Sequence, residues 1–539
     1  MDNKRVILAV ALSFAVLLGW QFLFPPQPQQ PVPAQQEQTA ESNQAVDSNV
    51  AGPVSSQLPD PASTSAIVSA KGTKLTVETP LYSAVINSQG GLLESFKLKK
   101  FKATIDADSP DVDMVGTNAL NKAPMGLILN GIATWANGVW GYEGGNIHLD
   151  GDKLGTIIFR GDVEGFRIER RLTFHADNYL IDEDVRIINK SNPSGMGRLA
   201  FTTATKSLTA ADDRYNPTRI AWFNAEGLVE ENDRDELSEN GVSETGNISW
   251  AAIDSNYFIL ALVPGSDSVT MKGKLQDDIF RIAAEQNVSF DKDIERKLSC
   301  SYYFGPMDAP LMAKVPGNLD KAIDFGWFDI IAKPLVVALE WFNQYVHNYG
   351  ISIILLTIVI KILFWPLSHK SYKSMEQMKR LQPMMAKLRE KHGDDREALN
   401  KEMMQLYKTY NVNPAGGCLP MLLQIPVFFG LYKALMGTVA LRHADFVHFL
   451  PFTDIVWLAD LSAKDPLYIT PIVMGATMFL QQKMTPSAGD PTQQKIMMFL
   501  PLVFTFMFLN FPSGLVVYWM VNNVLSIAQQ WMMMRNVKN

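Results

Sequence analysis

A single lysine inside a long apolar segment limits the folds available to this chain. Residues 351–367 read ISIILLTIVIKILFWPL, and Lys361 stands inside this run, one helical turn after Thr357. A lysine at the centre of a bilayer costs roughly 2.5–3.5 kcal/mol, so intramembrane charges usually face a protein interior or water and carry a function. The segment therefore predicts a membrane protein with a polar interior surface.

The N-terminal residues are predicted to form an anchor and a tether. Lys4 and Arg5 precede a 19-residue apolar run, 6–24, that is close to the length of a membrane span and shows no small-residue cleavage site. We therefore expect residues 1–24 to form an uncleaved transmembrane anchor with a cytoplasmic N-terminus. Residues 25–62 are rich in Pro, Gln, Ser and Ala, which predicts a disordered linker.

Residues 63–333 have the pattern of a large all-β domain. Short alternating runs are separated by Gly, Asn and Asp turns, which is typical of an antiparallel sandwich or barrel. His148 and His175 are isolated, and Cys300 and Cys418 show no metal-ligand spacing. We therefore predict no catalytic residue, no metal site and no cofactor. The domain is interpreted as an extracytoplasmic binding or scaffolding domain, and the chain as a non-enzyme.

Helices are predicted after residue 333. In 334–349 polar residues recur at helical spacing, and Trp341 and Tyr345 are suited to anchor an amphipathic helix in the bilayer interface. A core helix of the preceding domain is the alternative. Residues 350–539 are expected to form a five-span core, which gives six transmembrane helices with the anchor. The later spans are expected at 418–436, interrupted by Pro420 and Pro426, at 466–482, interrupted by Pro471, and at 496–511 and 513–533.

Residues 369–413 are predicted to form a cytoplasmic helical hairpin that turns at Gly393 and Asp394. The stretch 368–413 carries ten Lys and Arg against six acidic residues, so the positive-inside rule places it and both termini in the cytoplasm. Flexible methionines suit the binding of varied apolar segments, and packing of the two helices against each other is the alternative. The candidate substrate-receiving residues are Met375, Met378, Met385, Met403 and Met404.

Other polar residues in the spans accompany Lys361. In the last span a set of amides and one hydroxyl recurs at helical spacing, and such a stripe faces a partner or water in a membrane. The spans contain no Asp or Glu for an ion relay, which argues against a pump. We predict a polar groove in which Lys361 attracts a negatively charged segment; extension of Lys361 to the cytoplasmic headgroups is the alternative. The stripe comprises Asn522, Asn523, Ser526, Gln529 and Gln530, and the groove also includes Thr357, Gln424 and Asn510.

Three motifs resemble those of a known family. NPAGGCLPMLLQIPVFFGLY at 413–432, QQKMTP at 481–486 and FPSGLVVYWMVNN at 511–523 are similar to segments of the YidC/Oxa/Alb membrane protein insertases. The resemblance covers the whole chain, in the arrangement of the Gram-negative YidC branch. It implies a polytopic α-helical membrane protein with a β-supersandwich periplasmic domain, an interfacial helix and a cytoplasmic hairpin. It also implies a hydrophilic groove open to cytoplasm and lipid but closed to the periplasm.

The resemblance implies roles for individual residues. Lys361 takes the position of the basic groove residue, which is arginine in many members, and Thr357 matches a functional threonine on the same helix. The aromatic pair of the last span is often Tyr-Tyr in relatives and is Tyr518-Trp519 here. Trp519 lacks the hydroxyl and is expected to make apolar contact with substrate.

The resemblance further implies a function and partners. It implies an insertase and chaperone of the bacterial inner membrane that acts alone or with the Sec translocon. The implied partners are nascent membrane proteins including ATP synthase subunits, the ribosome and the lipid bilayer, without DNA. A secondary transporter would show paired inverted repeats, which the spans lack. An anchored carbohydrate-binding protein would need a convergent carboxylate or histidine site, which the sequence does not reveal.

Overall fold

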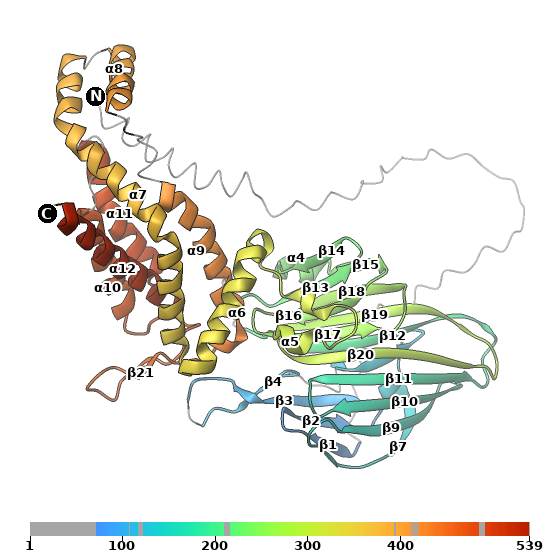
Figure 1. Cartoon of the computed structure of the whole chain (residues 1–539). Coiled ribbons are helices and arrows are strands. Elements are labelled where there is room, and N and C mark those ends of the chain that lie inside the picture. Colours follow the sequence, from blue (N-terminus) through green and yellow to red (C-terminus); the bar gives the residue numbers. More distant parts are fainter. Residues whose placement is uncertain are drawn as a thin grey trace, which may run out of the picture. The chain divides into compact units, whose positions relative to one another are not determined.

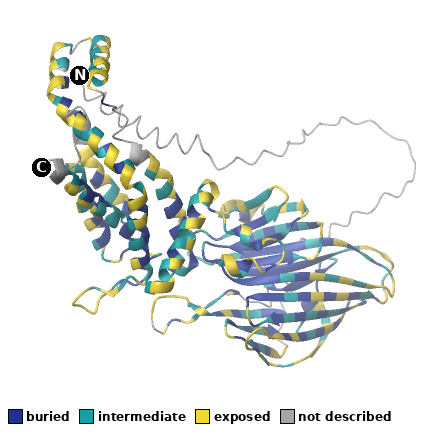
Figure 2. Ribbon diagram, in the orientation of Figure 1, coloured by how far each residue is buried: buried dark blue, intermediate teal, exposed yellow. Residues whose placement is uncertain are grey.

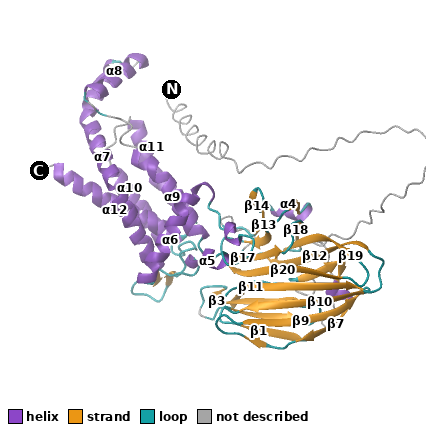
Figure 3. Ribbon diagram, turned by 45° about the vertical axis from the view of Figure 1, so that its right-hand side comes forward, coloured by secondary structure: helices purple, strands orange, loops and turns teal. Residues whose placement is uncertain are grey.

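The computed structural model describes residues 72–537, apart from residues 107 and 411 and the segments 117–121, 210–215, 393–394, 413–418 and 485–490. The expected anchor, 1–24, and linker, 25–62, lie outside the described residues. Figures 1 and 3 show that the strands and the long helices occupy successive parts of the chain. Each part is described in turn.

The strand-rich part, as far as it is described, contains three large sheets. Their strand orders are β4-β3-β2-β1-β8, β14-β13-β16-β17-β20-β11-β10-β9-β7 and β15-β18-β19-β12-β5-β6. The first sheet comprises β1 (Lys74–Glu78), β2 (Tyr82–Asn87), β3 (Leu92–Lys102), β4 (Asp111–Asp113) and β8 (Ile147–His148). The second comprises β7 (Gly138–Glu143), β9 (Leu154–Val163), β10 (Phe166–His175), β11 (Leu180–Asn189), β13 (Arg219–Asn224), β14 (Gly227–Glu231), β16 (Trp250–Asp254), β17 (Phe258–Pro264) and β20 (Glu295–Pro306). The third comprises β5 (Gly126–Leu129), β6 (Ile132–Ala133), β12 (Gly195–Lys206), β15 (Val242–Gly246), β18 (Val269–Gln276) and β19 (Ile279–Phe290). Two short helices, α3 (Thr134–Asn137) and α4 (Arg234–Glu239), connect strands.

Alternation of side chains explains why these segments form half-buried strands. In β10, Phe166, Ile168, Leu172 and Phe174 are buried while most residues between them are only partly covered. β10 pairs antiparallel with β9 and with β11 along nearly its whole length, and Figure 2 shows alternating buried and exposed blocks along such strands. Inner residues of all three sheets share one apolar core. The predicted β-rich domain is therefore confirmed.

Arg170 occupies an inward-facing position of β10 and ties separate segments together. Its Nε donates to Glu183 Oε1 at 2.5 Å, and its Nη atoms donate to the carbonyl oxygens of Gly90 and Met125. Tyr302 Oη donates to the other Glu183 oxygen at 3.0 Å. Arg170 and Glu183 are 0% and 1% exposed, so this is a fully desolvated ion pair held by hydrogen bonds from several strands and turns.

A second buried carboxylate makes the stability of the β domain depend on pH. Asp254 accepts hydrogen bonds from Arg219 at 2.9 and 3.2 Å, and Glu230 lies 3.0 Å from the same guanidinium. Burial raises the pKa of Asp254 to about 7, although Arg219 opposes the shift. A carboxyl whose pKa is higher in the folded than in the unfolded state binds more protons when folded. We therefore expect the free energy of unfolding to fall as the pH rises from about 4 to about 7.

Denaturant unfolding of the full chain in detergent across this pH range measures the effect. In Asp254→Asn the amide does not titrate, so the fall in unfolding free energy between these pH values should be smaller than in the unaltered chain. An identical pH dependence in both proteins would assign it to another group.

The helical part begins before the predicted interfacial helix. The short helices α5 (Ala309–Met312), η1 (Leu319–Ala322) and η2 (Gly326–Phe328) lead into α6 (Asp329–Val346). The helix predicted at 334–349 thus starts earlier and ends earlier than expected. Asp329 suits its N-terminus, where a negative charge is favourable, and forms an ion pair with Lys333 at 2.5 Å. His347, with φ of 49°, ends it in the left-handed conformation.

The predicted hairpin is present, but its first half is not a separate helix. α7 (Tyr349–Lys391) is 43 residues long, contains Pro366 and Pro383, and joins the first core span to the hairpin without a break. α8 (Arg396–Thr409) forms the second half, capped by the Asp395 side chain, which accepts from the backbone N–H groups of two residues in the first turn. The first core span and the hairpin therefore share one helix.

Prolines do not interrupt the later helices as predicted. These are α9 (Leu419–Gly437), α10 (Ile469–Met484), α11 (Pro491–Phe508) and α12 (Ser513–Val537), with η4 (Val439–Leu441), β21 (Val447–Phe449) and β22 (Val456–Leu458) between α9 and α10. Pro420 and Pro471 lie in first turns, where proline removes no helical hydrogen bond, and Pro426 lies within α9. Among the described residues, 349–388 contains one helix long and apolar enough to span a membrane, and 423–437 and 497–508 are shorter apolar helices.

Candidate functional site

Lys361 lies on α7 and is directed at α12. The residue is 8% exposed, and its Nζ donates to Ser526 Oγ at 2.7 Å. Ser526 Oγ in turn donates to the carbonyl oxygen of Asn522 at 2.7 Å. The side chain therefore bonds across to the polar stripe rather than extending along α7 to solvent, as the snorkelling alternative requires.

The polar stripe of α12 bonds to two neighbouring helices, to α7 through Ser526 and to α10 through Asn523 and Gln530. Asn523 Nδ2 reaches Thr477 Oγ1 of α10 at 3.5 Å, and Gln530 Nε2 donates to the carbonyl oxygen of Met484 at 2.6 Å. The four residues Asn523, Ser526, Gln529 and Gln530 are each at most 3% exposed. Polar side chains that bond between helices are a common source of helix association in membranes.

The electrostatics around Lys361 favour the binding of a negatively charged group. A lysine ammonium has three donor hydrogens, and among the described residues Ser526 alone accepts from Lys361, with no carboxylate in ion-pair range. Gln529 Nε2 and Gln530 Oε1 are also buried without a hydrogen-bond partner. A buried cation with a neutral partner and unused donors is stabilised when a carboxylate approaches.

The structure does not gather every predicted groove residue around Lys361. Thr357 is buried on the same helix, but its hydroxyl donates to the carbonyl oxygen of Ile353 at 2.6 Å. Gln424 is half-buried on α9, and Asn510 is exposed in the turn before α12. At 1.5 Å per residue, Asn510 lies roughly 20 Å along the helix axis from Ser526. The place of Asn510 in the groove therefore stays a prediction, and this residue is not part of the cluster around Lys361.

The aromatic pair of α12 lies in the helical core. Tyr518 is 4% exposed, and Trp519 is half-buried. The Trp519 ring lies edge-on to that of Phe428, with 4.6 Å between the ring centroids, and its centroid is 5.2 Å from that of Phe508. Trp519 therefore packs helices α9, α11 and α12 together, and its contact with substrate stays a prediction.

The methionines of the hairpin divide into two groups. Met378 and Met385 are buried between α7 and α8, with Met403 packed against them, as the packing alternative expects. Met404 is 56% exposed, and Met375 is half-buried. Of these five methionines Met404 is the exposed one, and reception of a substrate by the hairpin stays a prediction.

Sequence reasoning missed two residues of α10 that shape the site. Thr477 is the partner of Asn523, and a hydroxyl in the middle of an apolar helix was a signal for it. Gly475 lies so close to α11 that a Cβ there would come within 1.9 Å of Thr505 Oγ1. Small residues allow membrane helices to approach closely, so Gly475 holds α10 against α11.

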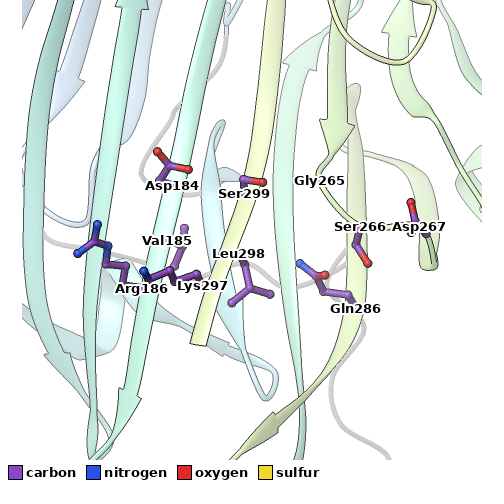
Figure 4. A pocket seen from close by; sticks show the side chains of 10 residues that line it. All are labelled: Asp184, Val185, Arg186, Gly265, Ser266, Asp267, Gln286, Lys297, Leu298 and Ser299. Atoms are coloured by element: carbon purple, nitrogen blue, oxygen red, sulfur yellow. The ribbon is translucent and has the colours of Figure 1, made fainter. Parts of the chain in front are cut away.

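The β domain contains a polar pocket. Figure 4 shows this pocket, of about 530 Å³, with Asp184 and Asp267 on opposite sides of it. Arg186 and Lys297 add positive charge. Within the described residues no group of three His, Cys, Asp or Glu could hold a metal ion.

A long apolar helix with a buried lysine, joined to a separate β domain, defines a membrane protein with an intramembrane polar site. Residues 341–539 match the family described as 60Kd inner membrane protein, and residues 74–338 match the YidC periplasmic domain. The chain belongs to the YidC family of membrane protein insertases, and its function is membrane protein insertion.

Curated relatives support this membership over the full length. The membrane protein insertase YidC of Maridesulfovibrio salexigens is 94% identical over 539 residues, covering 100% of both chains. That of Nitratidesulfovibrio vulgaris (strain Miyazaki F) is 55% identical over 546 residues, covering 99% of this chain and 100% of the relative. A crystal structure of an active YidC insertase with its first transmembrane domain resolved aligns over 86% of this chain and 93% of that one, with 19% identity and a TM-score of 0.36.

Proposed function

We propose that Lys361 and the polar stripe of α12 form the path along which a substrate segment enters the membrane. The observation that carries this proposal is the buried Lys361 ammonium, which donates to the neutral Ser526 hydroxyl at 2.7 Å. An acidic residue in a translocated tail supplies the counter-charge that the site lacks. The lysine thereby holds the tail transiently while the adjoining apolar segment meets lipid.

The steps require no covalent chemistry. The exposed methionines of the hairpin receive an apolar segment, Lys361 draws its acidic tail into a hydrophilic groove, and the segment then slides along α7 and α12. Transfer into lipid is driven by burial of apolar surface, worth roughly 25 cal/mol per Å². The chain thus acts as an insertase and chaperone that makes and breaks no bonds, without a cofactor. A pump is disfavoured because α9 to α12 contain no Asp or Glu for an ion relay.

The proposal includes a topology. Six spans cross the bacterial inner membrane, with both termini and the hairpin in the cytoplasm, α6 in the interface, and the large domain, a β-supersandwich, in the periplasm. The excess of Lys and Arg in 368–413 supports this orientation. Nascent membrane proteins, including ATP synthase subunits, are the proposed substrates, with the ribosome and the Sec translocon as partners.

Deletion of residues 67–314 tests where the activity resides. We expect proteoliposomes containing the shortened chain to insert a small substrate nearly as well as the full chain, because α6 to α12 carry the proposed path. The shortened chain with Lys361→Ala serves as control and should be impaired to the same degree as the full chain with that change. Loss of insertion by a shortened chain that still folds in the membrane would move the essential site to the β domain.

A further inference from the structure

The loop between α9 and α10 ends in an apolar tip. β21 and β22 form a hairpin with the register Val447↔Leu458 and Phe449↔Val456, and Figure 1 shows it projecting beyond the helices that flank it. Phe452 at the turn is 107% exposed, and Phe449, Ile455 and Val456 are 51%, 50% and 40% exposed. Exposed apolar side chains gathered in so short a segment point to contact with lipid or protein.

The base of this hairpin is fixed to the beginning of the long spanning helix. Asn348 caps α7 by accepting from the backbone N–H of Ile351 at 2.9 Å, and its Nδ2 donates to the carbonyl oxygen of Phe446 at 3.1 Å. The ring of Phe446 covers Gly350, since a Cβ there would come within 2.1 Å of it. The hairpin therefore starts at the level where α7 begins.

The start of α12 fixes the other side of the loop at the same level. The backbone N–H of Ser513 donates to the carbonyl oxygen of Ala463 at 2.7 Å, and that of Gly514 donates to Leu461 at 2.9 Å. About six residues separate the base from Phe452, and at about 3.3 Å per residue the tip reaches roughly 20 Å from the base. A tip of this reach, starting where two spans begin, can lie along the bilayer surface.

We propose that the tip of this hairpin, residues 449–456, inserts into the outer-leaflet interface of the bilayer as a lateral anchor. This inference rests on the proposed topology, which places the beginnings of α7 and α12 at that surface. Because the hairpin starts where the spans α7 and α12 begin, its tip adjoins the bilayer. Lipid is therefore the partner that we expect the tip to contact. No Lys or Arg lies between Arg442 and Lys464, so insertion is driven by apolar burial rather than by anionic headgroups. The exposed Asp454 within the tip keeps the insertion shallow.

Quenching by nitroxide-labelled lipids tests the proposal on the full chain in proteoliposomes. In a background with Cys300→Ala and Cys418→Ala, an environment-sensitive fluorophore is attached at Phe452→Cys. Leu363→Cys, at a position 72% exposed on α7, is the membrane reference, and Asp150→Cys in an exposed turn of the β domain is the aqueous reference. With nitroxides near the headgroup, the quenching of the fluorophore at position 452 should be within about twofold of that at position 363. The fluorophore at position 150 should hardly be quenched.

The outcomes separate this inference from the topology on which it rests. Quenching at 363 but not at 452 overturns the anchor and leaves the topology standing, whereas absence of quenching at both overturns the topology as well. Blue-shifted emission at 452 without lipid quenching means that protein covers the tip, which also overturns the proposal. Adding Phe449→Ser and Ile455→Ser to the Phe452→Cys chain should reduce its quenching, and unchanged quenching would show that the fluorophore alone had driven insertion.

Discussion

Lys361→Ala is expected to slow insertion of substrates with an acidic translocated tail by about tenfold, because an attraction worth about 1.4 kcal/mol is lost. Lys361→Arg should be tolerated, since it keeps the positive charge beside Ser526. Reconstituted liposomes carrying each variant, with a substrate whose tail is acidic, provide the measurement.

A matched substrate with a neutral tail is the control for this prediction. It should insert at similar rates with all three proteins, because the attraction requires a charge on both partners. If the acidic-tailed substrate also inserted equally well with lysine, arginine and alanine, the electrostatic role of Lys361 would be refuted. The geometry of the Ser526 contact would then be only a packing feature of α7 and α12.

Arg170→Ala is expected to destabilise the β domain by about 3–5 kcal/mol, because it leaves the Glu183 carboxylate buried without its cation. The change also removes the donors to the carbonyl oxygens of Gly90 and Met125. Hydrogen exchange of the full chain, read by mass spectrometry on peptides from β10 and β11, reports this loss as faster exchange.

Arg167→Ala is the matched control on the same strand. Its side chain is 61% exposed and lies 3.2 Å from Asp162, so its ion pair is worth at most about 1 kcal/mol. Exchange in β10 and β11 should barely change in this variant. Equal exchange in the two variants would mean that Glu183 finds another partner or a proton when Arg170 is removed.

Two features of this molecule were predictable because a charge interrupts an apolar pattern. Lys361 interrupts an apolar helix, and the structure bonds it to Ser526 of the predicted stripe. Arg170 stands in the inward register of β10 between Ile168 and Leu172, and the same reasoning would have identified it as a buried charge that needs a partner. Local periodicity likewise predicted the half-buried strands.

Other features depend on contacts between distant segments. The pairing of β11 with β20 joins residues 119 apart in the case of Asp182 and Ser301, and no local pattern encodes it. Pro426 sits inside α9 although proline weakens helices, because packing against neighbouring helices outweighs the lost hydrogen bond. The distance of Asn510 from Lys361 likewise depends on where α11 ends and α12 begins, which no local pattern encodes.

The continuity of α7 gives the molecule a mechanical property. A helix of 43 residues has an axis about 65 Å long at 1.5 Å per residue, and both Lys361 and the first half of the hairpin lie on it. We expect a partner that docks on the hairpin and tilts α7 to change the separation of the Lys361 ammonium from α12. Under the proposed topology and function, binding at the hairpin and retention of an acidic tail at Lys361 are therefore expected to be coupled through this one helix, without any relay of side chains.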